Sequence, residues 1–356
     1  GANVQNERLN DYFVNYVTPA KAKSLKKAVA RRGDIVITHR GTLGQVAYIP
    51  ENSAFDSYVI SQSQFRARFN FQVVTPSWVA LYFLSAAGSA RLLDGKGHTG
   101  VPALAQPTTN FRLLHLPLPP LNEQRAIAAA LSDVDALLAQ IDQLIAKKRN
   151  LKQAAMQQLL TGQTRLPGFS AEWEVKRLGN ILTHLGNGAI YESTSSFGLP
   201  VTRIETIADG AIDFSRVGYA VPTDELKKYR LKKGDILFSH INSIDHIGKV
   251  AIYESDTDLY HGINLLLLRP TEAVTSRYLF YWLGSTHGRK QSATLAKQAV
   301  SQASINTVEL KGIEVPLPGV AEQTAIATVL TDMDAELAEL EARRDKTRAL
   351  KQGMMQ

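Results

Sequence analysis

The chain of 356 residues contains no cysteine. Disulfide bonds, thiolate metal sites and cysteine nucleophiles are therefore excluded, and a reducing compartment such as the cytoplasm is the expected location. No apolar run approaches the ~20 residues that a transmembrane helix needs, and no basic segment followed by an apolar one opens the sequence. The sequence thus gives no indication of export or of a membrane partner.

Sequence signatures of catalysis are also missing. The patterns GxxxxGK[ST], HExxH and GxSxG do not occur. Pro-Asp, the usual start of a PD…(D/E)xK nuclease signature, is absent, and the only Pro-Pro lies in "LPPL", unlike the Asn/Asp-Pro-Pro-aromatic loop of amino-methyltransferases. We therefore expect no catalytic residue and no metal or cofactor bound by this chain.

Acidic residues are scarce in one part of the chain. Residues 1–112 hold 13 Lys and Arg against 6 Asp and Glu, whereas residues 163–315 hold 17 against 16. Most of the formal net charge of +7 therefore lies in the N-terminal part. This distribution favours a polyanionic partner there, although many basic proteins bind no nucleic acid.

A long repeat dominates the rest of the sequence. When the chain is shifted by 199 residues, 117–157 aligns with 316–356 without a gap, and about half of these positions are identical. Each copy begins with prolines and carries a Glu-Gln pair in its first turn, which is typical of a helix start. Neither copy has an internal proline, so each predicts a helix of about 35 residues.

The similarity extends upstream of the helices. Residues 31–49 match 232–253, and 76–84 match 275–283, with a register shift of one or two. The chain is therefore two copies of one unit, each a globular domain followed by a long helix. Nothing comparable to residues 166–188 precedes residue 1, so we expect that the first domain lacks an N-terminal part of about 35–40 residues.

Apolar residues along both predicted helices are spaced alternately by four and three, which is the heptad seam of a coiled coil. We expect an α+β protein with two globular mixed α/β domains, separated by two long helices that form an antiparallel coiled coil with pseudo-two-fold symmetry. Two amphipathic helices, each packed on its own domain, are the alternative, which Arg344 favours slightly because it interrupts the second seam. The seam residues are Ile127, Leu131, Val134, Leu138, Ile141 and Ile145 in the first helix and Ile326, Leu330, Met333, Leu337 and Leu340 in the second.

Polar loops after the repeated Gly-Asp strands are the first candidates for ligand contact. The framework around the loops persists between the copies, whereas the loop residues differ, as two different recognition specificities would require. Their side chains can bond base edges and phosphates, although a hairpin turn facing water is equally consistent with them. The candidates are Thr38, His39, Arg40, Thr42 and Gln45 in the first copy and Ser239, His240, Asn242, Ser243 and His246 in the second.

A second pair of polar, basic loops precedes the prolines. The loop candidates are Lys96, His98 and Thr99 in the first copy, and Lys297, Gln298, Ser301 and Gln302 in the second.

Arg66 and Arg68 alternate with Phe65 and Phe69, which predicts a strand with one basic face, or simply a solvated one.

The repeated "PLPPLNEQ" and "PLPGVAEQ" helix entries, the "LKQAAMQQLLTGQTRLPGF" exit and the "GDI" strands resemble the specificity subunit of Type I restriction–modification systems. The resemblance covers essentially the whole chain. It implies target-recognition domains at 1–116 and 163–315 and conserved helices at 117–162 and 316–356. In that family each domain recognises half of a split DNA site, and the helices set the spacing.

The resemblance also implies the partners. These are double-stranded DNA, two methyltransferase subunits that use S-adenosylmethionine, and restriction subunits that use ATP and Mg. The chain itself would be a non-catalytic subunit that recognises a bipartite, asymmetric site and scaffolds the complex. A protein–protein scaffold without sequence-specific DNA binding is the alternative, and a self-contained methyltransferase or nuclease would require a catalytic loop that the sequence lacks.

Overall fold

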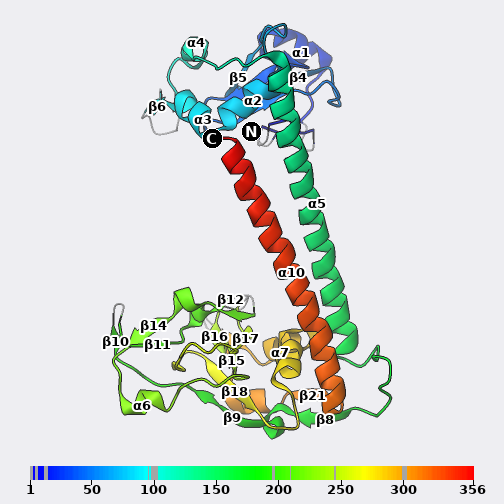
Figure 1. Cartoon of the computed structure of the whole chain (residues 1–356), viewed down its shortest axis with the longest axis vertical. Helices are drawn as coiled ribbons and strands as arrows, with labels where there is room; N and C mark the ends of the chain where they lie inside the picture. The colour runs from blue at the N-terminus through cyan, green and yellow to red at the C-terminus, as the bar shows by residue number, and fades with distance from the viewer. Residues whose placement is uncertain are drawn as a thin grey trace. The chain divides into compact units, whose positions relative to one another are not determined.

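A computed structural model of the chain describes residues 3–4, 7–11, 15–94, 96–97, 103–194, 197–208, 210–243, 246–298 and 303–356. The chain divides into two compact units, residues 1–143 with 341–356 (unit 1) and residues 144–340 (unit 2). Each unit contains a globular part and a stretch of each of two long helices, α5 (Leu121–Leu159) and α10 (Val320–Met354), as Figure 1 shows.

Both globular parts mix short strands with short helices. None of the helices in the described ranges combines the length and the apolar composition that a membrane span needs. The elements of unit 1 are α1 (Pro19–Ser24), η1 (Lys26–Ala28), β1 (Val29–Arg31), β2 (Ile35–Thr38), β3 (Val46–Tyr48), β4 (Ser57–Val59), β5 (Gln64–Ala67), α2 (Pro76–Leu84), α3 (Ala86–Leu93), β6 (Lys96–Gly97), β7 (Ala103–Leu104) and α4 (Pro107–Leu113). Those of unit 2 are β8 (Glu174–Arg177), η2 (Leu178–Ile181), β9 (Leu182–Asn187), β10 (Ser193–Thr194), β11 (Leu199–Val201), η3 (Ile204–Thr206), β12 (Ile207–Ala208), β13 (Ala211–Ile212), η4 (Phe214–Arg216), β14 (Gly218–Ala220), α6 (Asp224–Lys227), β15 (Ile236–Phe238), β16 (Ile241–Asn242), β17 (Val250–Ile252), β18 (Leu266–Pro270), α7 (Ser276–Gly284), α8 (Thr286–Thr294), β19 (Lys297–Gln298), β20 (Ala303–Ser304), α9 (Thr307–Lys311) and β21 (Glu314–Leu317).

The core of unit 1 is an antiparallel sheet in the order β3-β2-β5. Its middle strand has the sequence IVIT, rich in the β-branched residues that suit a strand packed on both faces, and all four residues are buried. Ile35 and Ile37 pack in one cluster with Val79 and Phe83 of helix α2. The apolar helix that follows the sheet in sequence therefore covers one of its faces.

Unit 2 has the same central strands with one addition, in the order β17-β15-β18-β9. Phe238 of β15 packs in one buried cluster with Tyr278 and Trp282 of α7. The hydroxyl of Tyr278 donates to the carbonyl of Pro316 at 2.7 Å, and burial raises the pKa of this phenol. Tyr278 and Trp282 of α7 thus occupy the positions at which α2 has the smaller side chains of Val79 and Phe83.

A glycine–aspartate turn precedes the middle strand of both sheets. Gly33 and Gly234 have φ angles of +80° and +90°, a conformation that favours glycine. Asp34 and Asp235, which follow them, are buried, and each carboxylate accepts the backbone N–H of the residue three positions earlier, at 2.9 and 2.7 Å. This pair of residues sets where the chain enters each core, which explains why "GDI" recurs.

The two long helices pair in antiparallel fashion within each unit, because residue numbers rise along α5 as those of its ion-pair partners fall along α10 (Figure 1). This confirms the predicted antiparallel coiled coil and replaces the alternative of two separate helices. The ion pairs are Asp135–Lys351 and Asp142–Arg344 in unit 1, and Lys148–Glu336 and Lys152–Asp334 in unit 2.

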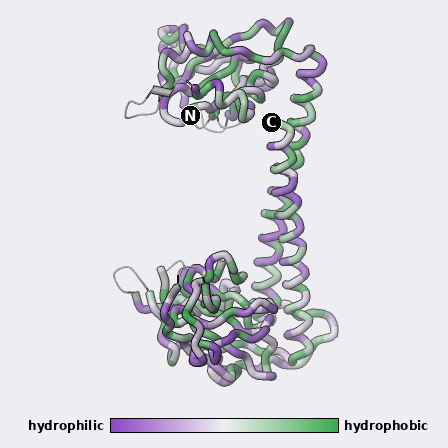
Figure 2. The backbone as a smooth tube through the Cα atoms, turned by 60° about the vertical axis from the view of Figure 1, so that its left-hand side comes forward, coloured by the Kyte–Doolittle hydropathy of each residue, from purple (hydrophilic) through white to green (hydrophobic). Residues whose placement is uncertain are grey.

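The predicted seam residues point away from solvent along both helices. Figure 2 shows hydrophilic and hydrophobic residues alternating along α5 and α10. The side chain of Arg344 is only 24% exposed, and its guanidinium lies 3.9 Å from Asp142, so a long charged residue occupies this seam position without a break in the helix. Buried seam residues are Leu131, Ile141, Ile145, Ile326 and Leu330; half-buried ones are Ile127, Val134, Leu138, Met333, Leu337 and Leu340.

Candidate nucleic-acid interface

The two loops singled out in the first copy lie side by side in unit 1. The loop that follows β2 contacts the segment around β7, since Leu104 N–H donates to the carbonyl of His39 at 2.9 Å. An isolated antiparallel bridge joins Arg40 to Ala103. Two segments about 65 residues apart in sequence therefore form one surface.

Unit 2 joins the corresponding loops in the same way. Ile305 N–H donates to the carbonyl of His240 at 2.9 Å, and β16 pairs with β20, which in turn pairs with β19. Lys297 of β19 has a side chain that is 73% exposed, with its ammonium 2.9 Å from Glu309. The same pairing of loops in both units supports one shared mode of ligand contact.

Exposure divides the candidates within these loops. Arg40 and Thr42 in unit 1 and Ser243 and His246 in unit 2 are exposed, and the hydroxyl of Ser243 lies 2.9 Å from Nδ1 of His246. These four side chains can reach a ligand without rearrangement. His39 and Gln45 are half-buried, with His39 Nε2 3.1 Å from the carbonyl of Gln62.

Three of the candidates are buried in the core. Thr38, Ser239 and His240 are 3%, 2% and 6% exposed, because each lies at or just beyond the end of a buried central strand. Nε2 of His240 is 3.1 Å from the side-chain nitrogen of Asn187, and burial lowers the pKa of this imidazole. These three side chains are buried in the structure described, and their base contacts stay a prediction.

Arg66 and Arg68 of the predicted basic strand face have a partner inside unit 1. The buried carboxylate of Asp34 lies 3.5 Å from Nη1 of Arg66 and 2.5 Å from Nε of Arg68. In unit 2 the matching Asp235 accepts two hydrogen bonds of 2.7 Å from Arg269. A buried carboxylate needs such partners, and the side chains of Arg66 and Arg68 remain 37% and 46% exposed, so their DNA contacts stay a prediction.

Some candidates cannot be placed. His98, Thr99, Ser301 and Gln302 lie outside the described residues. For Lys96, Asn242 and Gln298 only the backbone is described, in strands β6, β16 and β19. The DNA contacts of these seven residues stay a prediction.

A buried glutamine joins each long helix to its globular part. Gln124 is fully buried: its amide oxygen accepts Thr75 N–H at 2.9 Å, and its amide nitrogen donates to the carbonyls of Val73 and Pro119 at 2.9 and 2.8 Å. This side chain is the Gln of the Glu-Gln pair that marks the start of the helix.

Gln323 makes the same three bonds in unit 2. Its partners are Thr275 N–H at 2.8 Å and the carbonyls of Ala273 and Pro318 at 3.1 and 2.9 Å. The preceding Glu322 is also buried and bonds Arg165 and the indole N–H of Trp173. The repeated sequence therefore encodes a repeated joint between helix and domain.

The internal repeat also produces the same ion pair twice. Lys351 bonds both oxygens of Asp135 at 2.6 and 2.7 Å in unit 1, and Lys152 bonds Asp334 in unit 2, where the hydroxyl of Tyr281 donates to the second oxygen at 2.8 Å. Each lysine and each aspartate matches its counterpart at the 199-residue shift. That shift could have located these pairs from sequence, since lysine and aspartate recur at the same places in both copies.

The model of the Type I restriction modification DNA specificity domain matches residues 2–147 and 170–348. The chain belongs to this family. The two matched stretches cover both sets of loops and most of both long helices, so the family match includes the candidate interface as well as the helices that carry it.

Members of the DNA specificity family with curated names align with different shares of the chain. The putative Type I restriction enzyme MjaX specificity subunit of Methanocaldococcus jannaschii is 42% identical over 198 residues, 54% of this chain and 47% of its own length. The MjaVIII specificity subunit of the same organism is 26% identical over 87% of this chain and 74% of its own length. The EcoKI specificity subunit of Escherichia coli K12 is 28% identical over 61% of this chain and half its own length. The chain therefore spans about half the length of two of these three relatives.

Solved structures of the DNA specificity family share the fold. A chain from a structure on the complex assembly and conformational transition of the Type I R-M system has a TM-score of 0.59 at 22% identity, covering 92% of this chain and 81% of that one. The HsdS subunit of Thermoanaerobacter tengcongensis has a TM-score of 0.51 at 21% identity, covering 92% and 80%. At these identities the likeness concerns the fold alone.

Proposed function

We propose that the chain is the DNA sequence-specificity subunit of a Type I restriction–modification complex. Each unit would recognise one half of a bipartite, asymmetric DNA site through its paired loops. The observation that carries the proposal is one backbone framework presenting two sets of side chains: Arg40 and Thr42 in unit 1, against Ser243 and His246 in unit 2. Family membership and the names of the relatives support it.

The two sets differ in hydrogen-bonding capacity. A guanidinium such as that of Arg40 donates two parallel hydrogen bonds, which suits O6 and N7 of guanine in the major groove. The hydroxyl of Ser243 and the imidazole of His246 both donate and accept, which allows contact with several base edges or with phosphates. The halves of the site should therefore differ in sequence.

The chain would itself be non-catalytic. It would scaffold two methyltransferase subunits, which bring S-adenosylmethionine, and restriction subunits, which bring ATP and Mg. Because such a complex acts on the DNA of its own cell, we place the chain in the cytoplasm.

Adenine methylation mapped across the genome, in cells with and without this gene, tests the function. We expect the gene to add methylation at a single split motif whose halves differ. The variant Arg40→Ala should relax or abolish recognition of one half and leave the other intact, with Lys297→Ala as a comparison in unit 2. A purely protein-binding scaffold would add no motif, and its complexes would bind DNA with almost no dependence on salt, where phosphate contacts predict a steep one.

A further inference from the structure

A run of lysines lies on the surface of unit 1, apart from the paired loops. Helices α1 and η1 carry Lys21, Lys23, Lys26 and Lys27, all exposed. None of the four has a carboxylate within ion-pair distance among the described residues. The side chain of Thr18 caps α1 by accepting the N–H of Lys21 at 3.2 Å, so a hydrogen bond fixes the start of this helix.

The matching segment of unit 2 has no net charge. A shift of 201 residues aligns the Gly-Asp turns and places Lys26 and Lys27 on Lys227 and Lys228. In unit 2 these two lysines are neutralised by Asp224 at 2.9 Å and Glu225 at 2.5 Å, in the first turn of α6.

Three positions account for the difference in charge between the segments. Where unit 2 has Pro222, Asp224 and Glu225, unit 1 has Lys21, Lys23 and Ser24. Residues 21–28 therefore carry four positive charges and no negative one, whereas residues 222–229 carry two of each sign. Unit 1 keeps the lysine pair but has no acidic residues beside it. Stability of a solvated helix does not require this loss of acidic residues, because surface ion pairs contribute little to it.

An exposed aromatic side chain precedes the lysines. Tyr16 is 77% exposed, and its ring lies edge-on against Phe55 at 6.0 Å between centroids. Phe55 packs in the same way on Tyr58 at 5.8 Å. The phenol of Tyr16 is thus held at the surface by one ring contact, next in sequence to the basic helix.

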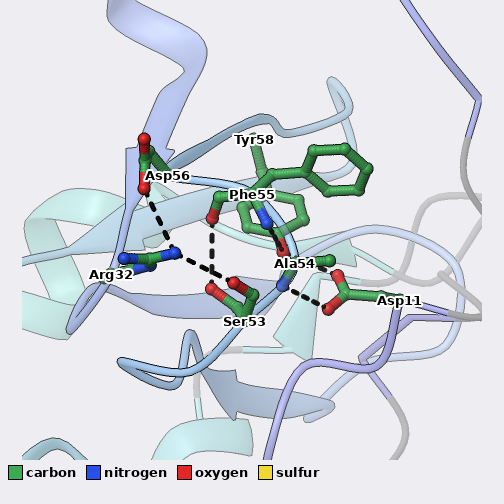
Figure 3. Close-up of polar contacts among 7 residues, drawn as sticks. All are labelled: Asp11, Arg32, Ser53, Ala54, Phe55, Asp56 and Tyr58. Atoms are coloured by element: carbon green, nitrogen blue, oxygen red, sulfur yellow. Dashed lines mark hydrogen bonds and ion pairs between the residues drawn. The ribbon is translucent and has the colours of Figure 1, made fainter.

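The loop that contains Phe55 is held by hydrogen bonds and an ion pair, which Figure 3 shows. Asp11 accepts the hydroxyl of Tyr58 at 2.6 Å and the N–H of Ala54 at 3.0 Å. Arg32 donates to the carbonyl of Ser53 at 3.0 Å and lies 3.1 Å from Asp56. Strand β1, which follows the lysines, pairs with β4, which follows this loop. The basic segment is therefore attached at one end through Tyr16 and Phe55 and at the other through β1 and β4.

We propose that residues 16–27, the anchor segment, contact the DNA phosphate backbone and give unit 1 a sequence-independent hold that this place in unit 2 lacks. The inference rests on the proposed DNA-binding function. Four unpaired ammonium groups match a row of phosphates, and a surface phenol can donate to a phosphate oxygen. The anchor segment would thus determine the affinity for DNA, while the paired loops determine the sequence specificity.

The test uses the full chain assembled with its methyltransferase subunits and a duplex containing the mapped motif. The dissociation constant is measured from about 50 to 200 mM salt for the wild type and for a Lys21→Gln, Lys23→Gln, Lys26→Gln, Lys27→Gln variant. Glutamine keeps helix propensity and removes charge. We expect the slope of log K against log salt to fall in magnitude by about two to four, because each lost phosphate contact contributes about 0.9, with the methylated motif unchanged.

Matched variants in unit 2 sharpen the test. Lys227→Gln with Lys228→Gln, which removes lysines already paired with acids, should change the slope by less than about one. The reverse exchange, Asp224→Lys with Glu225→Ser, leaves residues 222–229 with three positive charges and no negative one and should steepen the slope.

An unchanged slope in the four-lysine variant overturns the proposal. If that variant instead loses a protein subunit from the complex, the segment binds an acidic protein surface and the proposal is equally wrong. Failure of the proposed function itself looks different, since the wild-type complex would then show no motif and no preference among duplexes.

Discussion

Units 1 and 2 differ most where they face solvent and least where helix meets domain. Gln124 and Gln323 make the same three hydrogen bonds. In contrast, η1 carries lysines without an ion-pair partner among the described residues, whereas acidic residues of α6 neutralise the equivalent Lys227 and Lys228. After a duplication, both copies began with the same contacts and the same surface. The features retained in both therefore mark what the scaffold requires, and those that diverged mark what each half does separately.

The largest expected effect comes from the shared joint. Replacing Gln323 by Leu leaves a buried N–H and two carbonyls without partners, and we expect a loss of about 3–5 kcal/mol in the free energy of unfolding. Because Gln124 makes the same bonds, Gln124→Leu should cost a similar amount. Denaturant unfolding of each variant measures this. A loss below about 1 kcal/mol in either variant would show that the two joints are not equivalent.

The buried aspartates should respond unequally to loss of an arginine. Asp235 receives both hydrogen bonds from Arg269, so Arg269→Met leaves its carboxylate without a cation, at a cost of about 2–4 kcal/mol. Asp34 has two arginines, so Arg68→Met leaves Arg66 in place and should cost about half as much. Equal losses in denaturant unfolding would contradict this account of Arg66.

Acid should weaken unit 2 through a buried histidine. Burial lowers the pKa of His261 from 6.5 to about 4. The folded state thus holds a neutral ring that the unfolded state protonates, so the stability is complete above pH 6.5 and is lost as pH falls towards 4. At pH 5 the loss is about 2 kcal/mol. Hydrogen exchange of unit 2 amides at pH 7 and 5, compared with His261→Gln, measures it; an equal loss in the variant would exclude His261 as the cause.

In unit 1 burial shifts the pKa of a carboxyl group upward. Burial raises the pKa of Glu7, so this carboxyl favours folding most below its ordinary value of 4.5, and the benefit is lost as pH rises through the raised value. Amides of unit 1 should therefore lose less protection than those of unit 2 on acidification.

The smallest effect is expected at the repeated ion pair. The lysines and aspartates of both pairs are partly exposed, so Lys152→Met and Lys351→Met should each cost about 0.5–1 kcal/mol. Asp334 also accepts the hydroxyl of Tyr281, so the coupling energy from a double-mutant cycle of Lys152 and Asp334 should be the smaller of the two. A larger coupling there than for Lys351 and Asp135 would contradict this ranking.

The antiparallel helices could be predicted because apolar residues recur periodically along both of them. Residues such as Leu131 and Leu330 recur at heptad spacing, and the gapless repeat identified two equivalent helices. Arg344 was a misleading signal, since its long side chain lies partly buried beside Asp142 instead of ending the pairing.

The candidate interface was harder to predict. The polar residues of "ITH" and "FSH" indicate exposed loops, yet Thr38, Ser239 and His240 are buried because the strand continues into the core before the loop begins. The pairing of one loop with another rests on an isolated bridge in unit 1 and on strands of two residues in unit 2, which leave no pattern in the sequence. The partner of Arg68 is 34 residues away, and no local rule connects an arginine on one strand to an aspartate before another.

The glutamine joint has a consequence for how such chains change. Apart from a long contact of 3.5 Å from the Thr75 hydroxyl to Gln124, both Gln124 and Gln323 bond main-chain atoms of the adjoining domain: one joint uses the carbonyl of Val73 and the other that of Ala273. The connection therefore places little constraint on the sequence attached to it. A recombination event that replaced one globular part and kept the helix would leave these main-chain hydrogen bonds intact.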